Sequence, residues 1–156
     1  IHEGTHGIQA MDLLGRKVLM EEGRGLQLLT TRMTTTIQKA AAVPALAAHA
    51  QALDQALQQV ARATQETWAN GAQPADVLAN AVPYMQAFGH TVLAWLWLDV
   101  AHCALNRDAQ QTQPGTQGRM AAMRYFFRYE LPKIGAWLVV VAARDTTCAD
   151  VPLDAF

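Results

Sequence analysis

Apolar positions recur along this chain with the period of amphipathic helices. Between residues 46 and 64 they follow one another in steps of four and three, the spacing of a bundle helix with one buried face. These positions are Leu46, Ala50, Leu53, Leu57, Val60 and Thr64. Similar periods predict helices over residues 7–22, from Leu26 to the Val43-Pro44 pair, over 74–107 and over 118–144. We therefore expect an all-α fold, an up-and-down helical bundle of about five helices.

Glycine and proline mark the expected breaks between these helices. Gly23 and Gly25 separate the first two helices, and Asn70-Gly71 should end the third. Pro83 and Pro132 fall inside apolar periods, where we expect kinks or restarts. A glutamine-rich stretch over residues 106–118 predicts a polar loop before the last helix.

The faces of these helices that we expect to be buried consist of apolar side chains. In the first helix they are Ile8, Met11, Leu14 and Val18, and in the last Met120, Met123, Phe127, Leu131, Ile134, Leu138 and Val141. Residues 91–98 are apolar on every side, so this stretch is either central in the bundle or covered by a partner. Trp95 and Trp97 point to roughly opposite sides of a helix, and the second alternative predicts a homo-oligomer.

The opposite face of the last helix is basic and carries Arg119, Arg124, Arg128 and Lys133. Such a row can meet a nucleotide phosphate or an acidic partner, or it can simply be solvated, and the pattern assigns it no ligand. His49, His90 and His102 lie on separate predicted helices without the spacing of metal ligands, so no metal site is predicted there.

Composition narrows the function classes. The 156 residues are 51% hydrophobic with a net charge of −1, which favours neither a nucleic-acid nor a membrane surface. No apolar run approaches the ~20 residues of a membrane span, and no signal peptide is visible. Cys103 and Cys148 fit neither a disulfide framework nor a zinc cluster, so we expect reduced thiols in a cytoplasmic protein.

The first residues, His2-Glu3-Gly4-Thr5-His6, match the H-E-x-x-H pattern of zinc peptidases. That chemistry needs one helix through the motif, and Gly4 and Thr5 disfavour it. Thr5 instead suits an N-cap for a helix beginning near His6. Gln9 and Asp12 also stand where the extended pattern requires glycine and a third histidine, so a zinc hydrolase is the weaker alternative.

The longer segment Ile1-His2-Glu3-Gly4-Thr5-His6-Gly7-Ile8-Gln9 resembles the I-Y-E-G-T-x-x-I-Q segment of acyl-CoA dehydrogenases. The similarity continues loosely through Asp12-Leu13-Leu14-Gly15-Arg16-Lys17. Residues 125–128 and 130–132 resemble the last helix of a subgroup with an appended C-terminal helical domain. This subgroup includes dehydrogenases acting on 3-methylmercaptopropionyl-CoA and several fatty acyl-CoAs.

The resemblance implies α,β-dehydrogenation of an acyl-CoA thioester, with FAD as cofactor and an acceptor such as an electron-transfer flavoprotein. Glu3 would be the general base, Gly4 would line the substrate, and Thr5, His6 and Gly7 would contact the FAD. His2 replaces the usual tyrosine, and Gly7 replaces a frequent glutamine, so a side-chain contact at each of these positions is lost or changed.

The resemblance also implies a division of the chain. Residues 1–23 would close the dehydrogenase core, and residues 24–156 would form the appended bundle. Because the sequence opens at Ile1 inside a motif, we expect a C-terminal piece of a longer protein, inactive and without bound FAD in isolation. A purely structural assembly domain whose opening motif is inert is the third alternative.

Overall fold

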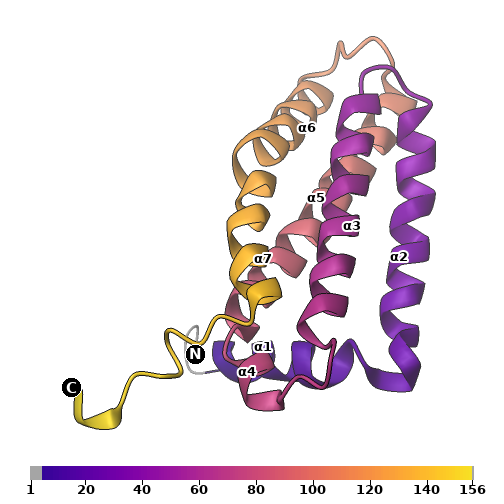
Figure 1. The fold of residues 1–156 in the computed structure, drawn as a ribbon. Helices are drawn as coiled ribbons and strands as arrows, with labels where there is room; N and C mark the ends of the chain where they lie inside the picture. Colours follow the sequence, from indigo (N-terminus) through magenta and orange to yellow (C-terminus); the bar gives the residue numbers. More distant parts are fainter. Residues whose placement is uncertain (1–4, 156) are drawn as a thin grey trace.

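The computed structural model describes residues 5–155, and within them the chain is helical without a strand. The bundle contains three long helices, α2 (Met20–Ala41), α3 (Ala47–Thr67) and α5 (Ala81–Arg107). Each of them runs antiparallel to the one before it (Figure 1). A composite fourth rod starts with α6 (Pro114–Tyr125) and ends with α7 (Ile134–Ala143). The predicted all-α, up-and-down bundle is thus confirmed.

The first segment lies across one end of the bundle rather than along it (Figure 1). It consists of α1 (His6–Asp12) and the π-helical turn η1 (Leu13–Lys17), and the short α4 (Pro74–Leu78) lies at the same end. The predicted helix over 7–22 does not run through. The backbone enters the left-handed region at Glu21, Glu22 and Gly23, with φ of 48°, 57° and 80°, and there it turns into the long axis of α2.

This placement changes which side chains of the first segment are buried. Ala10, Leu14 and Val18 are buried, whereas Ile8 and Met11 of the expected face are 60% and 46% exposed. A helix that crosses the end of a bundle is covered along a narrow stripe, so positions four residues apart are buried and the flanking apolar positions are not.

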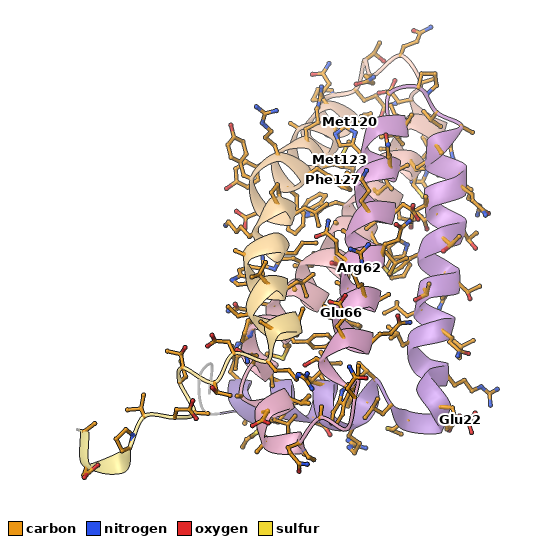
Figure 2. All side chains as sticks on the ribbon, viewed as in Figure 1. Glu22, Arg62, Glu66, Met120, Met123 and Phe127 are labelled. Atoms are coloured by element: carbon orange, nitrogen blue, oxygen red, sulfur yellow. The ribbon has the colours of Figure 1, made fainter. Side chains whose placement is uncertain are left out.

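The core faces of the third and last helices follow the predicted period. On α3, Leu46, Ala50, Leu53, Val60 and Thr64 are buried, and Leu57 packs partly buried against them. Met120, Met123 and Phe127 point from the final rod toward the interior (Figure 2). The remaining predicted positions of that face are buried as well: Leu131, Ile134, Leu138 and Val141.

The final rod is not the single helix expected over 118–144. It begins earlier, at Pro114, because proline fits the first helical turn, where its missing N–H is not needed. The preceding polar loop is correspondingly shorter than predicted. A π-helical turn, η2 (Phe126–Glu130), and a 3-10 turn, η3 (Leu131–Lys133), interrupt the rod beside Pro132, whose ring and lost N–H are incompatible with a regular α-helical ladder.

The predicted fourth helix divides into α4 and α5, and α5 restarts at Ala81 so that Pro83 falls in its first turn. In its all-apolar stretch Ala94 and Leu98 are buried, and the indole N–H of Trp95 donates to the Thr36 hydroxyl of α2 at 2.8 Å. The other side of this stretch is open: Leu93 and Leu96 are each 45% exposed.

Over residues 5–155, none of the helices combines the length and the apolar character needed to cross a membrane. Cys103 and Cys148 are both exposed free thiols.

Candidate functional site

The described part of the Ile1–Gln9 motif begins at Thr5 and leads into α1. Glu3 and Gly4, the predicted base and substrate contact, fall outside the described residues, as does His2. Thr5, His6 and Gly7, the predicted flavin contacts, are described and all three are exposed. They stand next to one another on the outside of the bundle end.

The helix begins at His6, as the sequence predicted, and Thr5 occupies the N-cap position. The carbonyl oxygen of Thr5 accepts the first helical hydrogen bond, from the Gln9 N–H at 2.8 Å. Its hydroxyl makes no capping bond, contrary to the expected side-chain cap. Since Thr5 lies outside the helix, α1 does not run through the H-E-x-x-H motif, and its start at His6 counts against the single helical face that a zinc peptidase requires.

The surface formed by Thr5, His6 and Gly7 is open to solvent and is not enclosed by other described residues. A Cβ added at Gly7 would meet no atom within 4 Å, so the space beside its backbone is open. The hollows found elsewhere on the described part of the chain do not include these three residues. Within residues 5–155 these three residues therefore form an open surface and not an enclosed site.

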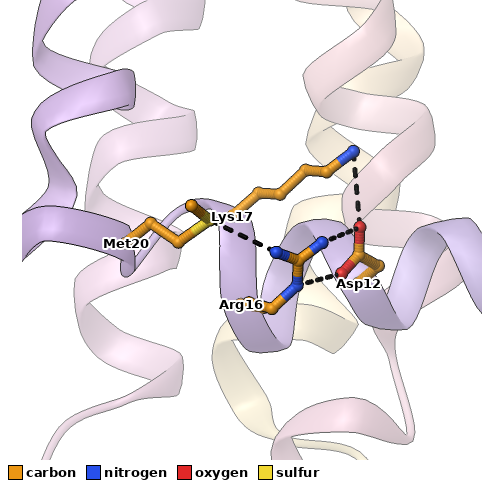
Figure 3. Close-up of polar contacts among 4 residues, drawn as sticks. All are labelled: Asp12, Arg16, Lys17 and Met20. Carbon is orange, nitrogen blue, oxygen red and sulfur yellow. Dashed lines mark hydrogen bonds and ion pairs between the residues drawn. The ribbon is translucent and has the colours of Figure 1, made fainter.

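Directly behind the motif, a carboxylate and two cations hold the π-helical turn together (Figure 3). Arg16 donates from Nε to Asp12 Oδ1 at 2.5 Å and from Nη2 to Oδ2 at 3.0 Å, and Lys17 Nζ lies 3.3 Å from Oδ2. The hydrogen bond from Arg16 lowers the pKa of Asp12 below its ordinary value. Arg16 Nη1 also points at the sulfur of Met20 at 3.5 Å.

Packing fixes the same turn onto the bundle. Leu14 is fully buried. A Cβ on Gly15 would lie 3.1 Å from Leu78 Cδ2, so glycine permits the close approach of α4. The segment between the motif and α2 is therefore a supported platform at the bundle end.

A second concave surface was not predicted as a site. It is a groove of about 650 Å³ between α3 and the final rod, which we call the α3–α6 groove. Its prominent polar and aromatic side chains are His49, Arg124, Tyr125, Arg128 and Tyr129. The sequence flagged Arg124 and Arg128 as part of a basic row. It did not associate His49 with them, because His49 is distant in the chain and only the tertiary fold brings it alongside.

The other members of the predicted basic row are engaged elsewhere. Lys133 Nζ lies 2.6 Å from Glu130 Oε2, and Arg119 lines a separate hollow between α5 and α6 together with Arg107 and Cys103. The basic row is thus divided between two surfaces and one ion pair.

Comparison with known protein families identifies the family of this chain. The fold is a helical bundle with a short helical segment across one end (Figure 1). A family model described as "Acetyl-CoA dehydrogenase C-terminal like" matches residues 29–152. That match covers well over half of the chain, and the chain belongs to this family. A comparison with curated proteins gave no match.

Proposed function

We propose that this chain is the C-terminal part of an FAD-dependent acyl-CoA dehydrogenase and that Glu3 is its general base. The observation that carries the proposal is the family match over residues 29–152, which lies closely behind the I-H-E-G-T-H-G-I-Q segment. A bundle of this family and a base motif of the matching enzyme class are thus joined in one chain.

Glu3 would remove the α-proton of the acyl-CoA thioester. An α-proton beside a thioester is weakly acidic, so the base must be held against the carbon in a dry site, where burial raises a carboxylate's pKa toward that of its target. Gly4 would let the thioester approach the backbone closely. Bound FAD would supply hydride acceptance from the β-carbon, giving the 2-enoyl thioester.

The chain's own contribution is positioning. Thr5, His6 and Gly7 offer an exposed edge, and the turn behind them is fixed by the Asp12–Arg16 pair and by buried Leu14. Such support matters because a base misplaced by about 1 Å loses much of its rate advantage.

We further propose that residues 1–23 close the dehydrogenase core and that residues 24–156 form the appended bundle. The kink at Glu21–Gly23 supports a boundary there, and the family match begins shortly afterwards. The substrate would be an acyl-CoA of the class used by the subgroup with an appended domain, which includes 3-methylmercaptopropionyl-CoA. The electrons would leave to an acceptor such as an electron-transfer flavoprotein.

The bundle would also assemble copies of the protein. Its α5 helix carries an exposed apolar stripe of Leu93, Leu96 and Val100, with exposed fractions of 45%, 45% and 40%. Residues spaced by three and four lie on one helix face, so this stripe can meet the same stripe of a second copy. A homo-oligomer is therefore the proposed state.

The test is the E3Q variant of the full-length protein, assayed for acyl-CoA-dependent reduction of an electron acceptor. The account predicts loss of turnover with the flavin still bound, because glutamine keeps the size of the side chain and removes the base. Turnover equal to that of the unaltered protein would refute the proposal and favour an inert motif on an assembly domain.

A further inference from the structure

The α3–α6 groove lies between α3 and the part of the final rod formed by α6 and η2. α7 packs on both α3 and α5, whereas α6 packs on α5 and has little contact with α3. The π-helical turn η2 lies between them and supplies Phe127, Arg128 and Tyr129 to the groove. A π-helical turn changes the direction of side chains relative to an α-helix and is common where a helix builds a site.

Two arginines bring uncompensated positive charge to this groove. Arg124 uses its Nε to donate to its own helix, at the Met120 carbonyl oxygen, 3.1 Å away. Within residues 5–155, neither Arg124 nor Arg128 forms an ion pair with a carboxylate. The planar guanidinium groups therefore keep donors free for an anion, which they bind best in the forked geometry of phosphate or carboxylate.

Glu130, the residue that follows Tyr129 in the chain, is already engaged by Lys133. Glu130 accepts from Lys133 Nζ at 2.6 Å and lies 3.5 Å from His90 Nε2. These contacts lower the pKa of Glu130, with the Lys133 hydrogen bond as the largest cause. Glu130 reaches the groove only through a long 3.4 Å contact with the Tyr125 hydroxyl, so it leaves the charge of the arginines in place.

Two tyrosines give the groove an aromatic rim. The rings of Tyr125 and Tyr129 lie 5.1 Å apart with planes tilted by 32°, and the residues are 56% and 61% exposed. Exposed aromatic faces stack on planar heteroaromatic rings, as they do on the bases of nucleic acids.

His49 forms the facing wall from α3. Its ring meets Phe127 edge-on with centroids 5.1 Å apart, and its Nδ1 is buried without a hydrogen-bond partner among the described residues. Burial, and secondarily the charge of Arg124, lowers the pKa of His49. His49 therefore gives the groove a half-buried wall with one nitrogen that has no partner among the described residues.

We propose that the α3–α6 groove binds a nucleotide, with its phosphates on Arg124 and Arg128 and its base stacked on Tyr125 and Tyr129. The groove's volume, its two free guanidinium groups and its aromatic rim match the two halves of such a ligand. Neither an apolar ligand nor a simple inorganic anion would use both features.

The nucleotide can be free or can be the adenosine-phosphate end of coenzyme A. Under the second source the inference rests on the proposed dehydrogenase function, since the groove would then hold the far end of its substrate. The first source needs no such connection. The binding measurement uses neither flavin nor turnover, so its failure and the failure of Glu3 as a base are separate results.

The test is titration of the isotope-labelled chain with ADP, coenzyme A and inorganic pyrophosphate, followed by NMR and calorimetry. We expect saturable shifts of residues 48–52 and 121–129, and an increase in the pKa of His49 as the phosphates arrive. R124Q/R128Q should weaken ADP binding at least about tenfold, which corresponds to ~1.4 kcal/mol. Y125A/Y129A should reduce ADP binding to the level of pyrophosphate.

The matched control is R107Q/R119Q, which also removes two positive charges, but from the separate hollow between α5 and α6. It should change ADP affinity much less than R124Q/R128Q does. Coenzyme A binding more tightly than ADP would identify the thioester substrate as the source, and equal affinities would identify a free nucleotide. No saturable ADP shifts in the unaltered chain, equal losses in both double variants, or pyrophosphate binding as tightly as ADP would overturn the proposal.

Discussion

The hydroxyl oxygens of Tyr84 and Thr64 lie 2.8 Å apart in the buried interface between α5 and α3. Thr64 donates its own proton to the Val60 carbonyl oxygen at 2.7 Å, so it accepts from the Tyr84 hydroxyl. Tyr84 is fully buried, and this bond satisfies its only polar atom inside the core.

Removing the acceptor, Thr64, and removing the donor, Tyr84, should therefore lower the free energy of unfolding by different amounts. T64V leaves the Tyr84 hydroxyl buried without a partner, and we expect a loss of ~1–3 kcal/mol in the free energy of unfolding. Y84F leaves Thr64 bonded to Val60 and should cost about 1 kcal/mol or less. Urea unfolding of both variants measures the difference, and a larger loss in Y84F than in T64V would contradict this assignment of donor and acceptor.

The same tyrosine predicts an alkaline limit to stability. Burial raises the pKa of Tyr84 from 10.0 to about 12. The unfolded chain then loses this proton at a lower pH than the folded chain, so stability is complete below pH 10 and falls as the pH rises toward 12. The loss of free energy of unfolding due to Tyr84 should be at most about 3 kcal/mol. It is measured as the difference between the pH profiles of stability of the unaltered chain and of Y84F.

Asp108 predicts the opposite dependence in acid. Its carboxylate accepts from the Gln113 N–H at 2.9 Å and from both the N–H and the hydroxyl of Thr112 at 3.1 Å, just ahead of α6. These bonds, the one from Gln113 first, lower the pKa of Asp108 below 3.8. Their contribution is present above that pH and is lost as the pH falls through the lowered value.

D108A should accordingly lower the melting temperature at pH 6 and reduce the further drop between pH 6 and pH 3. D54A is a suitable control, because within residues 5–155 the hydrogen bond of the Asp54 carboxylate is with Gln58 of its own helix, α3. If the melting temperature of D108A falls with pH in parallel with that of the unaltered chain, Asp108 does not contribute to the acid sensitivity.

The exposed stripe on α5 predicts self-association. L93K/L96K places two charges where apolar side chains would meet, and it should shift the sedimentation profile of the full-length protein toward smaller species. V139K is a control of the same chemistry on α7, where Val139 is 68% exposed outside the stripe. Identical profiles for all three proteins would exclude the stripe as the interface.

Local pattern predicted the long helices well and the surfaces poorly. The period from Leu46 to Thr64 identified a core face because α3 runs along the bundle with a buried side throughout. Ile8 and Met11 had the same spacing and are exposed, because burial there depends on α1 crossing the bundle end. That crossing is a tertiary property, which no local period contains.

The α3–α6 groove shows the same limit for function. The i,i+4 pairs Arg124–Arg128 and Tyr125–Tyr129 were visible in the sequence, but an α-helix places them on adjoining faces without a hollow. The π-helical turn at Phe126–Glu130 and the position of His49 create the hollow. The role of Glu3 was inferred from the resemblance of its motif alone, and it stays a prediction because Glu3 lies outside the described residues.

The most direct measurement compares E3Q with E22Q in the full-length flavoprotein. Both substitutions exchange one carboxylate for an amide, but Glu22 lies exposed at the turn into α2 (Figure 2). The account predicts that both variants keep the flavin absorption spectrum and that only E3Q loses flavin bleaching by acyl-CoA under anaerobic conditions. Bleaching of E3Q at the rate of E22Q would contradict the role of Glu3 as the base.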